Sequence, residues 1–274
     1  MPELPPKVRR NVSDQRVLMF GLRLDPLTME GVLDRCREAL RTRTRLLIGV
    51  VNAAKIVSLG KDEELRSSLL DCDLIVADGQ SVVWASRLLR KPLPTRVAGI
   101  DLFEELLRVA EAEGHAVYLL GAQPTVLEVL QTRLRELFPG LRIAGARDGY
   151  FGAQDNAAVA ATIRDSGADM LFLGMTSPKK EIFLRDWGSS LGVPVLHGVG
   201  GSFDVFAGVT KRAPATWQRL GLEWAYRLVQ EPRRMWRRYL TTNTAFIALT
   251  IRERLRPRPA FTPRPTTEKP GAAA

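Results

Sequence analysis

A run of glycines follows a short apolar segment in the last third of the chain. Pro194-Val195-Leu196 predicts a buried strand, and His197-Gly198-Val199-Gly200-Gly201 comes directly after it. Because glycine has no Cβ, Gly198, Gly200 and Gly201 would let an anion approach the backbone N–H groups closely. The same glycines could form only a tight turn. The run therefore indicates a phosphate or diphosphate site that the basic and aromatic residues beyond it could close.

A carboxylate stands where another apolar segment ends. Leu74-Ile75-Val76-Ala77 predicts a buried strand and is followed by Asp78-Gly79. A positioned aspartate can take a proton from a hydroxyl nucleophile. It can equally cap the following helix, which is a common role for aspartate and the one that the residues alone favour.

Apolar segments that alternate with helical patterns predict the scaffold for these residues. Strands are expected over 16–24, 45–51, 73–77, 116–120, 141–146, 170–173 and 193–197, and helices over 27–41, 81–89, 101–113, 124–137, 157–166 and 179–191. Such alternation predicts an α/β fold with a Rossmann-like, largely parallel sheet flanked by helices. Ligands of such sheets bind beyond the carboxyl ends of the strands. Five residues are expected at these ends, converging on one cleft: Asn52, Asp78, Gly121, Gly174 and Gly198.

Positive charge is concentrated near the C-terminus. The chain has 274 residues and a net charge of +10, and residues 211–258 hold twelve Lys or Arg against three Glu. A helix from Pro232 would place arginines on one side and apolar residues on the other. The basic side comprises Arg233, Arg234, Arg237, Arg238, Arg252 and Arg256, and the apolar side comprises Met235, Trp236, Tyr239, Leu240, Phe246 and Ile247. This pattern is typical of a helix on an anionic membrane surface, but also of an ordinary surface helix.

These patterns divide the chain into four parts: a flexible N-terminus over 1–16, an α/β catalytic domain over 17–210, a basic helical appendage over 211–256 and a disordered Pro-rich tail over 257–274. Cys36 and Cys72 lie in apolar contexts and are expected in the core without a disulfide. Neither a signal peptide nor a membrane span is expected, so a cytoplasmic location follows.

The glycine run belongs to a longer ordered set of motifs. These are Asn52-Ala-Ala-Lys55, Ala77-Asp78-Gly79, Arg96-Val-Ala-Gly99-Ile-Asp101, Gly149-Tyr150-Phe151, Gly174 with Ser177-Pro178-Lys179-Lys180-Glu181, His197–Asp204, Lys211-Arg212-Ala-Pro214, Glu223-Trp224, Tyr226-Arg227 and Glu231-Pro232-Arg233. In this order they resemble the WecB/TagA/CpsF family of bacterial glycosyltransferases (glycosyltransferase family 26). The resemblance runs from about residue 17 to residue 255.

The resemblance implies a reaction and its partners. A sugar would pass from a UDP-sugar to a polyprenyl-diphosphate-linked glycan acceptor, with anomeric inversion, in cell-envelope or exopolysaccharide synthesis. The donor sugar would be of the N-acetylmannosamine type, glucose or a uronic acid. The resemblance also favours peripheral docking of residues 232–256 on the inner face of the plasma membrane, and it leaves room for a homo-oligomer.

The resemblance also implies roles for single residues. Asp78 matches the family's proposed general base, Arg96 its active-site arginine, and Asn52 a residue that could hold a sugar hydroxyl. Asp204 could hold a ribose or sugar hydroxyl, or tie the glycine loop together. Further binding candidates for the diphosphate are Gly198, Gly200, Gly201, Arg212, Arg227, Arg233 and Arg234, although each arginine could instead be a surface charge.

No metal and no cofactor are expected. Asp71-Cys72-Asp73 has the Asp-x-Asp pattern of metal-dependent transferases, but it precedes its strand, at the end away from the expected cleft, and indicates a solvated turn. No Cys-x-x-Cys motif or Cys/His cluster is present. The leaving diphosphate would then depend on cations and backbone amides for its stabilisation.

Two positions depart from the family pattern. Val50 stands where the family's Thr-x-Asn element has a hydroxyl, and Lys180 replaces a glutamine in Pro-Lys-Gln-Glu. A buried lysine is costly unless an anion accompanies it. Lys180 could therefore face a substrate phosphate or a uronic acid carboxylate, or it could lie on the solvent side of a helix start.

Two other classes of function remain open from the residues. Alternating strands and glycines would suit a nucleotide-dependent oxidoreductase, but no G-x-G-x-x-G follows the first strand. The basic C-terminal segment would suit a non-catalytic membrane or nucleic-acid adaptor, but it contains no nucleic-acid motif, and no nucleic-acid partner is expected.

Overall fold

The computed structural model describes residues 16–219, 221–230 and 232–262. The flexible N-terminus and the disordered tail expected from the sequence fall mostly on residues 1–15 and 263–274, outside the described part of the chain.

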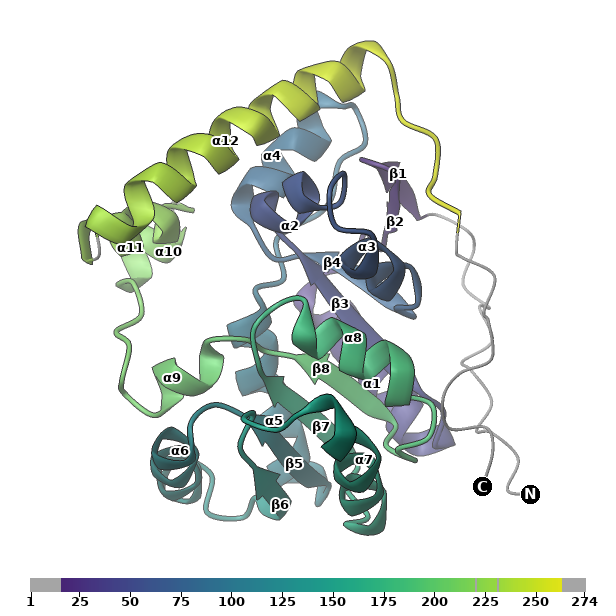
Figure 1. The fold of residues 1–274 in the computed structure, drawn as a ribbon, viewed down its shortest axis with the longest axis vertical. Helices are drawn as coiled ribbons and strands as arrows, with labels where there is room; N and C mark the ends of the chain where they lie inside the picture. Colours follow the sequence, from purple (N-terminus) through teal and green to yellow (C-terminus); the bar gives the residue numbers. More distant parts are fainter. Residues whose placement is uncertain (1–15, 220, 231, 263–274) are drawn as a thin grey trace.

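A six-stranded parallel sheet forms the centre of the molecule (Figure 1). Its strand order is β4-β3-β8-β7-β5-β6, and every neighbouring pair is parallel. The strands are β3 (Leu46–Val51), β4 (Leu74–Ala77), β5 (Ala116–Gly121), β6 (Arg142–Arg147), β7 (Met170–Gly174) and β8 (Val195–Gly198). This confirms the expected α/β, Rossmann-like fold.

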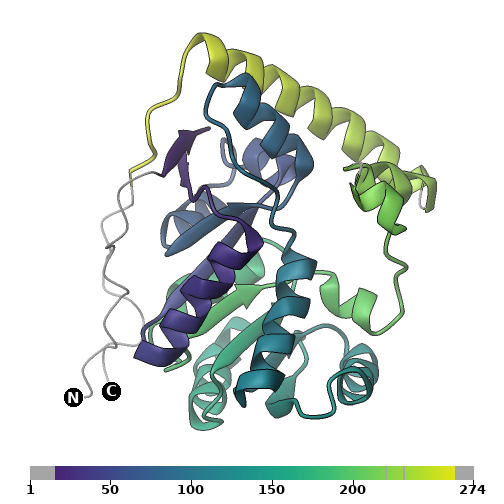
Figure 2. The ribbon, with the colours of Figure 1, turned by 180° about the vertical axis from the view of Figure 1, so that it is seen from behind.

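Helices connect the strands and cover both faces of the sheet (Figures 1 and 2). They are α1 (Met29–Thr42), α2 (Ala53–Ser58), α3 (Glu63–Leu70), α4 (Gln80–Leu88), α5 (Gly99–Glu113), α6 (Pro124–Leu137), a 3₁₀ turn η1 (Ala153–Asp155), α7 (Asn156–Asp165), α8 (Lys179–Trp187), α9 (Ser202–Phe206), α10 (Ala215–Arg219), α11 (Glu223–Gln230) and α12 (Pro232–Leu255). The short helices α2 and α3 were not expected, because six or eight residues carry little helical periodicity.

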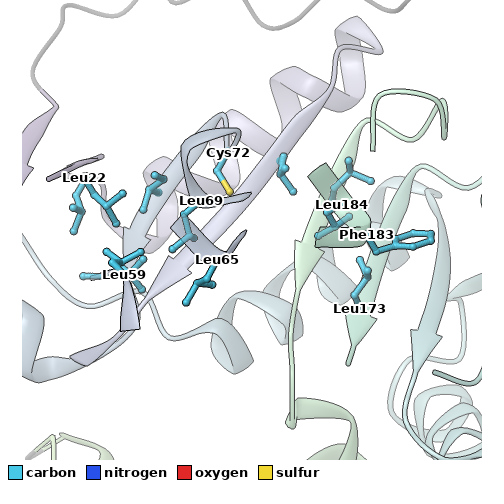
Figure 3. Close-up of a cluster of buried hydrophobic side chains, with 14 of the residues drawn as sticks. Leu22, Leu59, Leu65, Leu69, Cys72, Leu173, Phe183 and Leu184 are labelled. Carbon is cyan, nitrogen blue, oxygen red and sulfur yellow. The ribbon is translucent and has the colours of Figure 1, made fainter. Parts of the chain in front are cut away.

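Alternating side chains of the strands build a hydrophobic core on each face of the sheet. In β3, Leu47 and Val51 pack on one face, and Leu46, Ile48 and Val50 pack on the other. The first core includes α2, α3, α4, α7 and α8, and the second includes α1, α5, α6 and α9. Figure 3 shows part of the first core, with labelled side chains from α3, α8 and β7. This two-faced burial explains why β3, β4, β5, β7 and β8 are largely apolar in sequence, whereas the edge strand β6 is not buried.

The first expected strand is a hairpin instead. β1 (Val17–Met19) pairs antiparallel with β2 (Leu22–Leu24), apart from the main sheet. The turn between them consists of Phe20 and Gly21, with φ angles of 54° and 83°. Two consecutive residues with positive φ form the tight turn that two-residue hairpins require, so a single strand over 16–24 was wrong.

Part of the tail returns to this hairpin. The Phe261 N–H donates to the Gly21 carbonyl at 2.8 Å, and a Cβ on Gly21 would lie 2.6 Å from the Phe261 ring. The ring packs against the first core, with Arg66 over it. Residues 257–262 therefore lie against the folded part of the chain, because the glycine leaves a surface on which one aromatic ring fits.

The Asp-x-Asp pattern has a structural role. Arg45 is buried and pairs with Asp71 at 3.2 Å and with Asp73 at 3.3 Å, and Asp73 also accepts from the Leu47 N–H. These carboxylates are part-buried rather than a solvated turn, since they neutralise a buried guanidinium. Cys36 and Cys72 are buried and free, as expected.

Candidate active site

A cleft of about 1140 Å³ lies at the carboxyl ends of four strands, β3, β4, β7 and β8. It receives the residues that follow those strands, among them Asn52, Asp78, Gly174 and Gly198. Gly121 ends the next strand, β5, and packs against Gly174 without lining the cleft. Four of the five strand-end residues therefore converge as expected.

Asp78 is held at the cleft edge by two neighbours. Its Oδ1 accepts a hydrogen bond from the Gly99 N–H at 2.9 Å, and its Oδ2 lies 3.5 Å from Asn52 Nδ2. The helix that follows Asp78, α4, has Gly79 at its N-cap and no side-chain cap. Asp78 thus does not cap the next helix. It contacts the first residue of α5 and keeps its carboxylate in the cleft.

His197 binds the carbonyl group of the same residue, Gly99. This fully buried imidazole donates from Nε2 to the Gly99 carbonyl, 3.1 Å away. Burial lowers the pKa of His197 to about 4, so the ring is neutral at physiological pH. His197 and Asp78 together fix the start of α5 beneath the cleft.

Arg96 meets a residue from the C-terminal appendage. Its Nη2 lies 3.3 Å from Glu223 Oε1, and both residues line the cleft. Glu223 Oε1 also lies 3.7 Å from Arg212 Nη2, and Arg212 pairs with Asp101 of α5. Arg212 does not itself line the cleft. Two arginines expected to bind substrate thus share one carboxylate.

The three glycines after β8 differ in what they do. A Cβ on Gly198 would lie 3.0 Å from Lys180 Cδ and Cε, so its absence makes room for the lysine stem. Gly200 has a φ of 55°, and its N–H donates to the Leu173 carbonyl at 3.1 Å. Within the described residues the Gly201 N–H makes no hydrogen bond, and a Cβ there would meet only Asp204 Oδ2, at 3.8 Å. Of the three, Gly201 has the free donor and the open approach that an anion needs.

Lys180 is buried beneath this loop and belongs to a polar cluster. Its Nζ donates to Ser177 Oγ at 2.8 Å and lies 3.3 Å from Glu181 Oε1. Lys55 reaches the same Glu181 oxygen at 2.9 Å, and Ser177 donates to it at 2.8 Å. Lys180 therefore does not face solvent at the start of α8. It lines the cleft at the carboxyl end of β8.

The cluster has two cations for one anion. Burial, and then the charge of Lys55, lower the pKa of Lys180 to about 8. Burial alone would raise the pKa of Glu181, but Lys55 and Lys180 bring it down to about 2. The carboxylate therefore stays ionised. Asp78 is a second anion near Lys180 in the cleft and favours the charged form of the lysine.

Asp204 lines the cleft beside Gly201. Burial raises the pKa of its carboxyl group. Its backbone carbonyl, rather than its side chain, ties the loop by accepting from the N–H groups of Val209 and Thr210. Among the described residues the Asp204 carboxylate makes no hydrogen bond, which leaves it free for a ligand hydroxyl.

The remaining arginine candidates lie further out or cannot be placed. Arg233 is exposed in the first turn of α12 and does not line the cleft. The side chains of Arg227 and Arg234 lie outside the described part of the structure.

Lys55 and Glu223 belong to the motifs of the family resemblance, but neither was among the expected site residues. Lys55 follows Asn52 by one helical turn, so both face the cleft from the start of α2. Glu223 is one of three acidic residues among twelve basic ones in residues 211–258. That isolation is a signal that could have identified it.

The described residues contain neither a cluster of metal ligands nor a membrane-spanning helix. None of them form a group of three or more His, Cys, Asp or Glu arranged to hold a metal ion. No helix in the described part of the chain is long and apolar enough to cross a membrane.

The match to known families covers nearly the whole of this architecture. The model of the Glycosyl transferase WecG/TagA/CpsF family matches residues 17–260, from the β1–β2 hairpin to beyond the end of α12. This span includes the cleft and the helices that border it. The chain therefore belongs to this family of glycosyltransferases, whose members act in cell-envelope polysaccharide synthesis.

Proposed function

We propose that the protein transfers a sugar from a UDP-sugar to a polyprenyl-diphosphate-linked glycan, with inversion at the anomeric carbon. The donor sugar is of the N-acetylmannosamine type, glucose or a uronic acid. The observation that carries the proposal is that Asp78, Arg96, Lys180 and Gly201 line one cleft. The cleft thus contains a carboxylate base, two cations and a free backbone N–H donor.

Asp78 acts as the general base. Its Oδ1 is engaged by Gly99, and its Oδ2 has only the long contact with Asn52. The less engaged oxygen can accept the proton of an acceptor hydroxyl as that hydroxyl attacks the sugar. Asn52, whose Oδ1 accepts from the Lys55 N–H, can use its amide N–H to orient a sugar hydroxyl beside the base.

Cations stabilise the departing diphosphate. Arg96, Lys180 and Gly201 line the same cleft as Asp78. Arg212, Arg227, Arg233 and Arg234 are further candidates from the appendage. Preorganised cations and amides of this kind stabilise a developing negative charge without a metal, so transfer should continue in the presence of EDTA.

The outer side of α12 supports docking on an anionic membrane. Trp236, Leu240, Ile247, Ile251 and Leu255 are exposed and follow one another at helical spacing. Exposed arginines accompany this stripe: Arg233, Arg237, Arg252 and Arg256. Tyr239 and Phe246, expected on the same apolar side, turn inward instead, and Phe246 packs on Phe20 with ring centroids 5.6 Å apart. The protein would then act peripherally at the cytoplasmic face.

A ligand titration tests the donor class. The thermal unfolding of the purified protein is followed with UDP, UDP-sugars, NAD and NADP, with and without EDTA. UDP and one UDP-sugar should raise Tm in both conditions. Stabilisation by NAD or NADP alone would contradict the proposal.

Family membership argues against the two other classes of function that the sequence analysis left open. The family model that matches residues 17–260 describes glycosyltransferases. It therefore favours a transferase over an oxidoreductase and over a non-catalytic adaptor.

A further inference from the structure

The cleft continues from its polar end into a trough between α4 and α12. Figures 1 and 2 both show these two helices side by side. On α4 the lining residues follow the spacing of one helical face: Gln80, Ser81, Trp84, Ala85 and Leu88. On α12 the lining residues do the same: Tyr239, Thr242, Asn243, Phe246, Ile247, Thr250 and Ile251. Two helical faces thus form the walls of one trough.

The trough and the polar end have opposite chemistry. Among the described residues that line the cleft, those from α4 and α12 include no Asp, Glu, Lys or Arg. Large apolar side chains are instead left open to solvent: Trp84 is 49% exposed, Leu88 56%, Ile247 59% and Ile251 52%. Exposed apolar groups gathered along a groove mark a site that another molecule covers.

The division of charge fits one kind of occupant, an amphiphile with an anionic head and an apolar tail. In the described part of the chain, the cations that line the cleft are Lys55, Lys180 and Arg96. All three come from outside α4 and α12, and the head would lie against them. From Tyr239 to Ile251 the α12 wall is about 18 Å long, at 1.5 Å per residue. That length accommodates several units of a branched hydrocarbon chain.

We infer that the trough binds the isoprenoid segment of the diphosphate-linked acceptor, with Trp84 and Leu88 of α4 as one wall and Ile247 and Ile251 of α12 as the other. This inference rests on the proposed function, which supplies an acceptor of that class. The trough is continuous with the exposed stripe of α12, since Ile247 and Ile251 belong to both. The chain would therefore pass from the membrane surface along the trough while its diphosphate remains at the cationic end.

A soluble probe tests this binding without turnover. Dansyl-labelled geranyl diphosphate is titrated onto the full-length protein and displaced by farnesyl diphosphate, dodecyl diphosphate or inorganic diphosphate. Farnesyl diphosphate should displace it at a concentration at least about tenfold below that of inorganic diphosphate, because burial of the chain adds affinity. It should also displace the probe better than the unbranched dodecyl chain.

Matched variants locate the site. Leu88→Ser and Ile251→Ser should each weaken the binding of farnesyl diphosphate roughly fivefold or more. The affinity for inorganic diphosphate should not change. Leu137→Ser is the control for Leu88, because Leu137 is 59% exposed on α6 and does not line the cleft. Leu255→Ser is the control for Ile251, because it lies one turn further along the same stripe and also outside the cleft. Neither control should change the affinity.

The outcomes separate the trough from the proposed function. The inference is wrong if farnesyl diphosphate binds no more tightly than inorganic diphosphate. It is also wrong if the control substitutions reduce the affinity for farnesyl diphosphate as much as the trough substitutions do. Equal competition by the dodecyl chain would indicate a general acyl groove and would overturn the isoprenoid assignment. UDP binding is measured on the same samples. Its absence in the wild type would contradict the proposed function, whereas its presence without prenyl binding would contradict the trough alone.

Discussion

Arg96 and Glu223 lie 127 positions apart in the chain, yet Arg96 Nη2 and Glu223 Oε1 are 3.3 Å apart in the cleft. The contact joins the loop before α5 to the start of α11. Glu223 is also within 3.7 Å of Arg212. A diphosphate bound in the cleft would have to compete with this carboxylate for Arg96, the one of the two arginines that lines the cleft.

Replacing Glu223 should therefore strengthen nucleotide binding. In Glu223→Gln the isosteric amide keeps the shape but removes the competing charge, so UDP should bind several-fold more tightly by calorimetry. In the Arg96→Ala background the same replacement should have a smaller effect, because the arginine that lines the cleft is gone. Unchanged or weaker UDP binding in Glu223→Gln alone would show that the carboxylate does not compete.

Asp78→Asn should abolish most turnover without loss of structure. The asparagine can still accept from the Gly99 N–H, but it cannot take a proton, so kcat should fall by roughly 10²- to 10⁴-fold. UDP should still raise Tm. Asp165→Asn, at an exposed position on α7, is the control and should retain full activity. An Asp78→Asn enzyme with wild-type turnover would refute the assigned base.

Lys180 should make UDP binding pH-dependent. Its pKa is about 8 in the folded protein, so the cation is lost as pH rises through that value, and the UDP dissociation constant should rise. Lys180→Gln should bind UDP roughly 10- to 100-fold more weakly below pH 8, with little change above it. Lys179→Gln, at the exposed neighbouring position, should keep the wild-type pH profile. A flat wild-type profile from pH 7 to 9.5 would exclude this role.

The same lysine should affect stability in the opposite direction. Its pKa is lower in the folded protein than the value of 10.5 for the free side chain, so unfolding takes up a proton between about pH 8 and 10.5. Stability of the wild type should therefore rise with pH in this window relative to Lys180→Gln. Urea unfolding of both proteins at pH 7.5 and 9.5 measures the difference. A difference that stays constant with pH would contradict the buried position of the amine.

Alanine substitutions should separate the glycines of the loop. Gly201 has a φ of −74° and open space at Cβ, so Gly201→Ala should keep the wild-type Tm. The new methyl group should cover the free N–H and reduce the affinity for UDP several-fold. Gly200 has a φ of 55°, and Gly200→Ala should lose about 1 kcal/mol, or about 2–4 °C in Tm. Gly60→Ala, with no atom within 4 Å of the new Cβ, is the control. Full UDP affinity in Gly201→Ala would exclude a phosphate at this N–H.

Membrane association should depend on the outer stripe of α12. Trp236→Ser combined with Leu240→Ser should reduce sedimentation with anionic vesicles, because both side chains are exposed and apolar. Deleting the chain after Pro232 should abolish it. That deletion also removes Glu253, whose Oε1 accepts from the Phe20 N–H, so the surface variants are the cleaner measurement. Val129→Ser, on α6, is the control. Unchanged sedimentation of the double variant would refute the docking surface.

Local patterns predicted most of the scaffold. Apolar runs identified β3, β4, β5, β7 and β8, because strands covered on both faces carry no polar alternation. The hairpin escaped prediction because Phe20, a bulky residue at a φ of 54°, conceals the turn. The position of Phe261 escaped it because a single aromatic residue in a Pro-rich tail gives no periodic signal.

By itself the sequence determined the fold class, the family and the strand-end positions of Asn52, Asp78 and Gly198, since each depends on short-range order along the chain. Only the tertiary structure decided that Lys180 is buried rather than exposed, that Glu223 joins Arg96, and that Gly201 rather than Gly200 has the free N–H. These properties depend on groups brought together from distant segments. The strand order β4-β3-β8-β7 and the return of α11 and α12 over the cleft bring them into contact, and no local pattern specifies that contact.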